Sequence, residues 1–180
     1  MVNGITPFWK ACLRKLPPAA PLPVPKLIGA KHPPDSLPLD ALQLLPRIPW
    51  DAGLVAAWRP GEAGAQAQLE QFCTTALTDY AQGRDWPGRE GVSRLSPHLH
   101  FGEISPRQIW VAVTNAMGGD PLSSKGAETY LREIGWREFA HYVLYHWPHT
   151  PEQPLQERFA AYPWRKEYAE LLQAWQQGRT

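Results

Sequence analysis

Apolar residues repeat at helical spacing in several segments of this chain, and no segment alternates with the sustained period of two that half-buried strands show. The plainest helix is predicted from about residue 64 to residue 82, with Gly83 ending it as the C′ residue. Its apolar residues form one stripe: Leu69, Phe72, Cys73, Ala76 and Tyr80. The predicted fold is therefore all-α, an irregular multi-helix bundle with long connections.

Capping residues indicate where the other helices begin. Starts of this kind occur at Thr6-Pro7, Asp40, Ser96-Pro97, Ser105-Pro106 and Ser123 or Ser124. Gly118-Gly119 would end the helix that begins near Ser105, and the helix after Ser124 would run to about His146. A last helix, from about residue 166 to residue 177, is predicted to bury Tyr168, Leu171, Leu172 and Trp175.

The first third of the chain is rich in proline, which determines its expected conformation. Most of the 20 prolines lie before residue 61, so residues 17–39 are expected to run extended. Apolar residues interleave with these prolines, and we expect them to pack: Leu22, Val24, Leu27 and Ile28. We predict one partial domain, in which residues 1–60 form a linker-like leading segment and residues 61–180 form the helical part.

Composition excludes several classes of protein. A net charge of +1 gives no overall sign of a nucleic-acid partner. Cys12 and Cys73 stand alone, which argues against a disulfide scaffold or a zinc site. The histidines match no metal-site spacing, so no metal is expected. No apolar run approaches transmembrane length, and the chain start lacks a signal-peptide core, which favours a cytoplasmic location with no membrane partner.

Two serines shortly precede the helix start at Pro97. Ser93 and Ser96 offer hydroxyls where the unpaired N–H groups of a helix N-terminus point back toward the loop. This chemistry suits a phosphate, because the donors and the helix dipole both favour an anion. Ordinary helix capping by serine is the alternative.

The helix predicted to end near His146 has one face of unusual chemistry: Tyr130, Glu133, Trp136, Arg137 and His141. The opposite face carries its core stripe: Leu131, Gly135, Phe139 and Tyr142. One interpretation is a surface ion pair between Glu133 and Arg137, worth about 0.3–0.5 kcal/mol. Trp136 favours a stacked ligand instead. Gly135 costs about 1 kcal/mol inside a helix, which close packing or close ligand approach would explain.

Three runs resemble one family. DYAQGRDWPGREGVSRLSPHLHFGEISPRQIW is similar to the flavin-phosphate region of the DNA photolyase and cryptochrome family, REIGWREFAHYVLYHWP to its signature helix, and TPFWKACLR to the stretch after its antenna domain. The resemblance implies a helical domain that binds FAD in a U-shape. It also implies that light-excited, reduced flavin donates an electron to a cyclobutane pyrimidine dimer in damaged DNA and then recovers it.

The resemblance assigns roles by position. Residues implied to bind FAD are Tyr80, Val92, Ser93, Arg94, Leu95, Ser96, Tyr130 and Arg137. Residues implied to contact DNA are Arg84, Glu133, Trp136 and Arg137, of which Glu133 and Trp136 are the catalytic pair: Glu133 would hydrogen-bond the flipped dimer and Trp136 would stack on it. Val92 stands where family members commonly have Thr, and Tyr130 where some have Trp.

The resemblance covers only part of the family's length. The antenna domain and the later helices of the flavin pocket are missing from this sequence, so we expect the chain alone to bind FAD weakly or not at all and to be inactive. The full protein is expected to be a deoxyribodipyrimidine photolyase. Two alternatives stay open: a cryptochrome-type photoreceptor, and a helical module without activity. Glu133 beside Trp136 favours repair.

Overall fold

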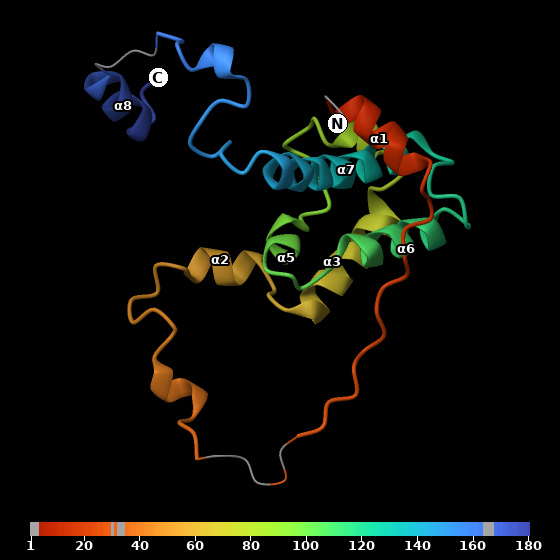
Figure 1. The fold of residues 1–180 in the computed structure, drawn as a ribbon. Helices are drawn as coiled ribbons and strands as arrows, with labels where there is room; N and C mark the ends of the chain where they lie inside the picture. Colours follow the sequence, from red (N-terminus) through yellow and green to blue (C-terminus); the bar gives the residue numbers. More distant parts are fainter. Residues whose placement is uncertain (1–3, 30, 32–34, 164–167) are drawn as a thin grey trace. The chain divides into compact units, whose positions relative to one another are not determined.

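The computed structural model describes residues 4–29, 31, 35–163 and 168–180. Those residues form helices and no strand, which confirms the all-α prediction. In chain order the elements are α1 (Ile5–Leu13), η1 (Leu39–Leu42), α2 (Ala52–Ala57), α3 (Glu62–Thr75), α4 (Tyr80–Gly83), α5 (Ser96–His100), α6 (Pro106–Ala116), α7 (Lys125–His146), η2 (Glu157–Phe159) and α8 (Ala169–Gln176) (Figure 1). No helix of the described ranges is long and apolar enough to cross a membrane.

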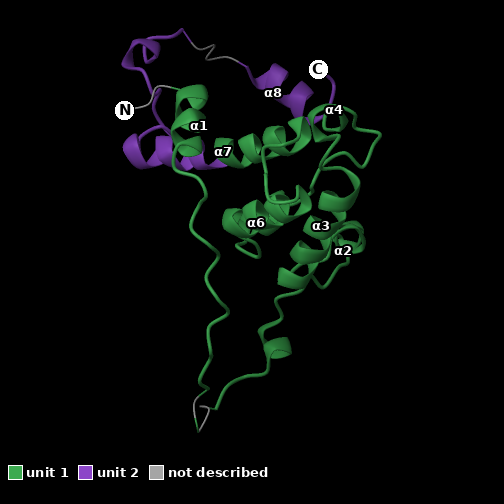
Figure 2. Ribbon diagram, turned by 90° about the vertical axis from the view of Figure 1, so that its right-hand side faces the viewer, with its two compact units in different colours: residues 1–136 green, residues 137–180 purple. Residues whose placement is uncertain are grey.

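The chain divides into two compact units (Figure 2). The first unit is Met1–Trp136 and the second is Arg137–Thr180, so the division falls within α7. This division differs from the boundary near residue 60 at which the sequence changes composition. The first unit holds all the candidate site residues except Arg137.

The core of the first unit forms where α3 packs against α6. The largest fully buried side chains come from these helices, from α7 and from the segments between them: Phe72, Leu77, Leu95, Ile109, Val113 and Leu131. Leu69, Phe72, Ala76 and Tyr80 are all buried, as the predicted stripe requires. Burial of these side chains is the main favourable term holding the helices together.

The predicted helix from residue 64 to residue 82 is interrupted, which the periodicity did not predict. It divides into α3 and α4, with turns between Thr75 and Tyr80. A Cβ on Gly126 of α7 would stand 2.2 Å from the Leu77 carbonyl oxygen, so α7 crosses the chain directly at this turn. Thr74 and Thr75 also donate their hydroxyls to the Gln71 carbonyl, which competes with regular helix bonding. Gly83 is the last residue of α4 rather than a C′ residue.

Two predicted caps are confirmed. Ser105 and Gln108 form a reciprocal capping box at the start of α6, and the Ser124 hydroxyl accepts from the Ala127 N–H at 3.0 Å. The predicted end of α6 also holds, because Gly118 and Gly119 have φ of 67° and 105°.

Three other predicted starts are displaced. Thr6 lies inside α1, whose N-cap is Gly4, and Asp40 lies inside η1, whose N-cap is Pro38. Ser96 is the first residue of α5, whose N-cap is Leu95. In each case the helix begins one or more residues earlier than predicted, and its N-cap residue has no side-chain cap hydrogen bond. The first backbone bonds run from Phe8 to Gly4, from Ala41 to Pro38 and from Leu99 to Leu95.

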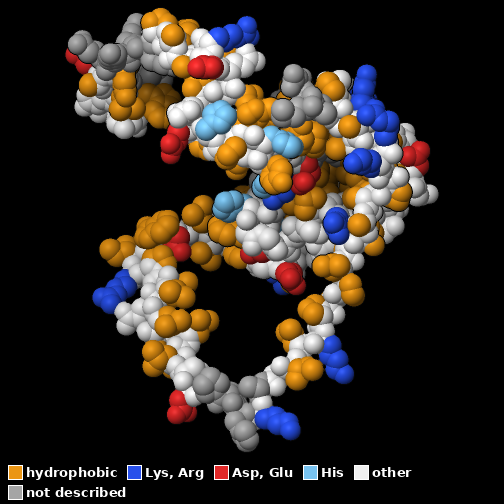
Figure 3. Space-filling model, in the orientation of Figure 1, with side chains coloured by type: hydrophobic (Ala, Val, Ile, Leu, Met, Phe, Trp, Pro, Cys, Tyr) orange, Lys and Arg blue, Asp and Glu red, His pale blue; other side chains and the backbone are white. Residues whose placement is uncertain are grey.

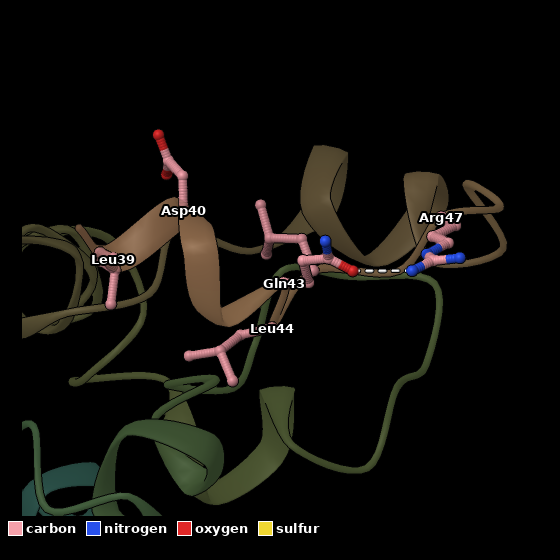
Figure 4. Close-up of a pocket in the computed structure, with 6 residues that line it drawn as sticks. Leu39, Asp40, Gln43, Leu44 and Arg47 are labelled. Atoms are coloured by element: carbon pink, nitrogen blue, oxygen red, sulfur yellow. Dashed lines mark hydrogen bonds between the residues drawn. The ribbon is translucent and has the colours of Figure 1, made fainter. Parts of the chain in front are cut away.

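The proline-rich segment does not pack its apolar side chains, and this prediction was wrong. Leu22, Val24, Leu27 and Ile28 are 86% to 95% exposed, and Figure 3 shows apolar side chains along both limbs of the segment. Extended proline-rich chain turns successive side chains to different sides, so it builds no continuous apolar face that could dock. A hollow of about 550 Å³ lies around η1. Figure 4 shows its lining residues, among which the Arg47 guanidinium donates to the Gln43 amide oxygen at 2.7 Å.

The second unit consists of the end of α7, η2 and α8. Tyr142, Tyr145, His146 and Trp147 form a run of ring contacts, with Tyr142 and His146 at a centroid distance of 4.4 Å. The last helix begins at Ala169, and the start predicted near residue 166 lies outside the described residues. The predicted burial was wrong, since Trp175 is 70% exposed and Tyr168, Leu171 and Leu172 are also exposed. So short a unit has too little surface of its own to cover the apolar face of α8.

Candidate functional site

Three aromatic rings stand at the centre of the candidate site. Phe72, Tyr80 and Tyr130 lie 4.5 to 5.6 Å apart by ring centroid, and the two tyrosines meet edge to face at 5.1 Å. Tyr80 is 8% exposed and Tyr130 is 3% exposed. The two predicted cofactor-facing tyrosines are therefore brought together, with their rings mostly within the core.

The Tyr130 hydroxyl is buried and forms no hydrogen bond with the residues that the structure describes. Burial raises its pKa far above the ordinary value, and the nearby Ser93 hydroxyl opposes that shift without reaching hydrogen-bonding geometry. An unsatisfied buried hydroxyl lowers stability by about 1–3 kcal/mol, so a hydrogen bond to a bound ligand would be favourable here. Tyr130 and Ser93 together offer polar atoms that a bound ligand could pair.

Arg84 and Glu133 form the polar side of the same cluster. The Arg84 guanidinium donates to the Glu133 carboxylate at 2.5 Å, and both side chains are 34% exposed. This hydrogen bond raises the pKa of Arg84, while burial and then the Glu133 charge raise the pKa of Tyr80. Arg84 also lies 5.8 Å from the Tyr80 ring centroid. Glu133 thus pairs with a residue far away in the sequence.

The ion pair considered between Glu133 and Arg137 is not the one that forms. Arg137, in the second unit, donates to Glu138 at 3.1 Å. Because these partners are exposed and adjacent in sequence, the interaction contributes little to stability. The predicted DNA contacts Arg84 and Glu133 are side by side, whereas Arg137 belongs to the other unit.

The loop from Val92 to Ser96 is held by its own residues and by a distant tryptophan. Leu95 is fully buried, and its N–H donates to the Ser93 hydroxyl at 3.4 Å. Arg94 has a φ of 53°, and its guanidinium lies 4.6 Å from the Trp58 ring centroid. Val92 and Ser96 are exposed. The loop thereby presents hydroxyls on a fixed backbone.

His98 and Glu103 tie this loop to the start of α3. The buried His98 ring shares a hydrogen bond between Nδ1 and the Glu103 carboxylate at 2.5 Å. This bond, and next the nearby Gly61 N–H, lower the pKa of Glu103 below its usual 4.5. Among the described residues, no cluster of histidine, cysteine and acidic side chains could hold a metal ion.

Glu103 should make the fold acid-sensitive. A carboxyl with a lowered folded pKa stabilises the protein above its unfolded pKa, and that stability is lost as pH falls through the folded pKa. We therefore expect wild-type stability to decline below about pH 4.5 and Glu103→Gln to show a shallower decline there. Urea unfolding at several pH values measures this. Equal slopes in both proteins would contradict it; Glu152→Gln, at an exposed position, is the matched control.

Trp136 lies on the candidate face of α7, and its neighbour Gly135 lies on the opposite, core face. Trp136 is 45% exposed. Gly135 is buried, and a Cβ there would stand 2.7 Å from the Trp9 ring. Close packing therefore explains the glycine, as one of the two predicted causes. Trp9 packs against α7 at Gly135, whereas the Trp136 side chain is partly exposed to solvent.

Trp58 and Glu103 are the residues that sequence reasoning missed. Both lie outside the helices, so no helical periodicity marks either one. The five-residue spacing from His98 to Glu103 matches no helical contact, since α5 ends at His100.

Known proteins match this chain along nearly all its length. Residues 130–180 match the family described as the FAD binding domain of DNA photolyase. The chain is 38% identical to a deoxyribodipyrimidine photo-lyase of Agrobacterium fabrum and 36% identical to one of Thermus thermophilus, over 97% and 99% of its length. It is also 36% identical to cryptochrome-2 of Arabidopsis thaliana over 73% of its length.

A solved structure agrees with these sequence matches. The crystal structure of a bacterial class III photolyase from Agrobacterium tumefaciens superposes with a TM-score of 0.86 at 36% identity, over 98% of this chain and 36% of that one. The chain spans 36% of the Agrobacterium fabrum protein, 47% of the Thermus protein and 22% of the cryptochrome. By fold and by sequence alike, the chain belongs to the DNA photolyase and cryptochrome family.

Proposed function

We propose that this chain is part of a light-driven DNA-repair enzyme, a deoxyribodipyrimidine photolyase that splits cyclobutane pyrimidine dimers with reduced FAD. One observation carries the proposal: Glu133, ion-paired with Arg84, and an exposed Trp136 lie three residues apart in the middle of α7. An acid, a cation and a stacking ring are the groups that gripping an extruded base requires. The relatives named deoxyribodipyrimidine photo-lyase support the same reading.

The residues around Tyr130 fit a phosphate-bearing cofactor. Its unsatisfied hydroxyl lies beside Ser93, and α5 begins without a side-chain cap on its N-cap residue. Ser93, Ser96 and the backbone of residues 92–96 would hold the FAD phosphates, and Tyr80 and Tyr130 would line the cofactor with their hydroxyl edges. When bound, the reduced flavin supplies a light-excited electron to the lesion.

The lesion would meet Trp136 and Glu133. Trp136 would stack on the flipped dimer, and Glu133 would hydrogen-bond it and stabilise the charge that develops as it splits. Arg84 holds Glu133 in the lesion-free protein, so lesion binding exchanges one partner of the carboxylate for another. The freed Arg84 would then contact the DNA backbone.

The partners of the proposed enzyme are damaged DNA and FAD, in the cytoplasm. Since the chain spans 36% of the Agrobacterium proteins that it matches, we infer that the 180 residues alone offer one side of a cofactor site. We expect them to bind FAD weakly, with a dissociation constant well above the micromolar range. Absorbance titration of the 180-residue polypeptide with FAD measures this, and submicromolar affinity would refute it.

Repair itself is the direct test. The full gene product, loaded with reduced FAD, should restore a thymine-dimer oligonucleotide under blue light and leave it unchanged in darkness. Absence of light-dependent repair by flavin-loaded protein would reject the proposal. It would favour the second candidate, a cryptochrome-type photoreceptor, which the similarity to cryptochrome-2 supports. Absence of any flavin band would favour a helical module without activity.

Ser93 and Ser96 should serve the FAD phosphates beyond their local structural role. Replacing both with Ala in the full gene product should weaken FAD binding by more than the roughly 1 kcal/mol that loss of the Ser93 hydroxyl's bond from the Leu95 N–H would cost. Flavin dissociation constants and thermal unfolding midpoints are measured together. A lowered midpoint with unchanged flavin retention would mean that the serines serve only the local structure of the loop; Ser123→Ala, a distant exposed hydroxyl, is the control.

A further inference from the structure

The segment from Trp58 to Gly61 is held at both ends by the region around α5. At one end, the Arg94 guanidinium lies over the Trp58 ring, 4.6 Å from its centroid. At the other end, the Gly61 N–H lies near the Glu103 carboxylate and helps to lower its pKa, and Glu103 bonds His98. Two independent contacts therefore join this segment to the loop of residues 92–96 and the turn after α5.

Arg94 needs such a restraint. Its φ of 53° lies in the left-handed region, which few non-glycine residues occupy. The residue on its C-terminal side, Leu95, is fully buried, and the one on its N-terminal side, Ser93, accepts the Leu95 N–H. The direction of the Arg94 side chain and the position of the Ser93 hydroxyl thus follow from one backbone conformation.

Trp58 is also the first anchor after a long exposed stretch. It follows α2, which has no buried residue, and the apolar side chains of residues 22–28 before it are exposed. Trp58 itself is half-buried. Its place is set by the stacking with Arg94 more than by any packing of α2.

We propose that Trp58 is a positioning residue for the loop of residues 92–96, acting through Arg94. The proposal rests on the proposed function, in which this loop holds the FAD phosphates. Trp58 touches neither phosphate nor flavin; its ring face fixes the Arg94 guanidinium, and through the left-handed backbone of Arg94 it fixes the Ser93 hydroxyl. Loss of the ring face would let Arg94 leave the left-handed conformation. The groups of the loop that donate hydrogen bonds to the FAD phosphates would then move apart.

Two variants isolate the ring face. Trp58→Phe keeps an aromatic face for the cation, whereas Trp58→Leu keeps an apolar side chain without one. In the full gene product we expect Trp58→Leu to speed amide hydrogen exchange at Arg94 and Leu95, and to weaken FAD, by about fivefold each, with Trp58→Phe within about twofold of wild type. In an Arg94→Ala background, Trp58→Leu should add nothing.

Each outcome decides the proposal. Equal behaviour of Trp58→Leu and Trp58→Phe overturns it, as does unchanged exchange at residues 92–96 in Trp58→Leu. A full effect of Trp58→Leu in the Arg94→Ala background also overturns it, because Trp58 would then act by another route. Faster exchange in a protein that binds no FAD at all would uphold the positioning of the loop and reject the flavin assignment, so the two failures are distinguishable.

Discussion

Replacing Glu133 and replacing Trp136 should impair repair in different ways. In the full gene product, Glu133→Ala is expected to lower the yield of repair per absorbed photon by about tenfold to a hundredfold, because it removes a group that stabilises charge developing during splitting. Trp136→Ala is expected to weaken binding of damaged DNA by about tenfold or more, since base stacking contributes about 1–3 kcal/mol.

Both quantities can be measured on one thymine-dimer oligonucleotide. Glu128→Ala is the matched control, because it removes another ion-paired glutamate from the same helix. If Glu133→Ala changed affinity as much as yield, its role would be binding alone. If neither variant changed either quantity, this face of α7 would be structural and the photoreceptor alternative would gain.

Gly126→Ala should destabilise the protein strongly. A Cβ at this position would stand 2.2 Å and 2.4 Å from the carbonyl oxygens of Leu77 and Thr78, and backbone atoms cannot move aside as a flexible side chain can. We expect a loss of about 2–3 kcal/mol and a Tm lower by roughly 5–10 °C. Helix propensity alone predicts the opposite sign, a gain of up to about 1 kcal/mol.

Thermal and urea unfolding of the variant distinguish these signs. Gly88→Ala serves as the control, because no heavy atom lies within 4 Å of a Cβ built there and its change should stay within about 0.5 kcal/mol. A stabilised Gly126→Ala protein would mean that α7 does not cross the Leu77–Thr78 turn as closely as described.

Local patterns predicted most helices but not what happens where they cross. The stripe from Leu69 to Tyr80 is buried as expected. The helix nevertheless breaks within it, where α7 crosses the turn in close contact at Gly126. Ser105 with Gln108 is a cap whose partners are three residues apart, so sequence suffices for it. The predictions that α8 and the proline-rich segment bury their apolar side chains were wrong for another reason. A sequence pattern identifies apolar side chains but does not show whether another part of the protein packs against them.

The candidate site shows the same division. Sequence spacing offered Arg137 as the partner of Glu133, because i, i+4 is the contact that a single helix can make. In the structure Glu133 instead forms its ion pair with Arg84, a contact that exists only once α4 and α7 are packed. Sequence patterns singled out the two serines and the α7 face, whereas the family resemblance supplied the remaining site residues. The roles in flavin and DNA binding stay predictions.

The exposed proline-rich segment has a consequence for solubility. In an extended chain, alternate N–H groups point toward the same edge, and Pro21, Pro23 and Pro25 leave that edge without a donor. Leu22 and Val24, exposed between them, therefore lie on a backbone that cannot extend a β-sheet along that side. The chain can carry these side chains in water without offering a template for fibril growth, so the spacing of proline protects against cross-β aggregation where packing does not.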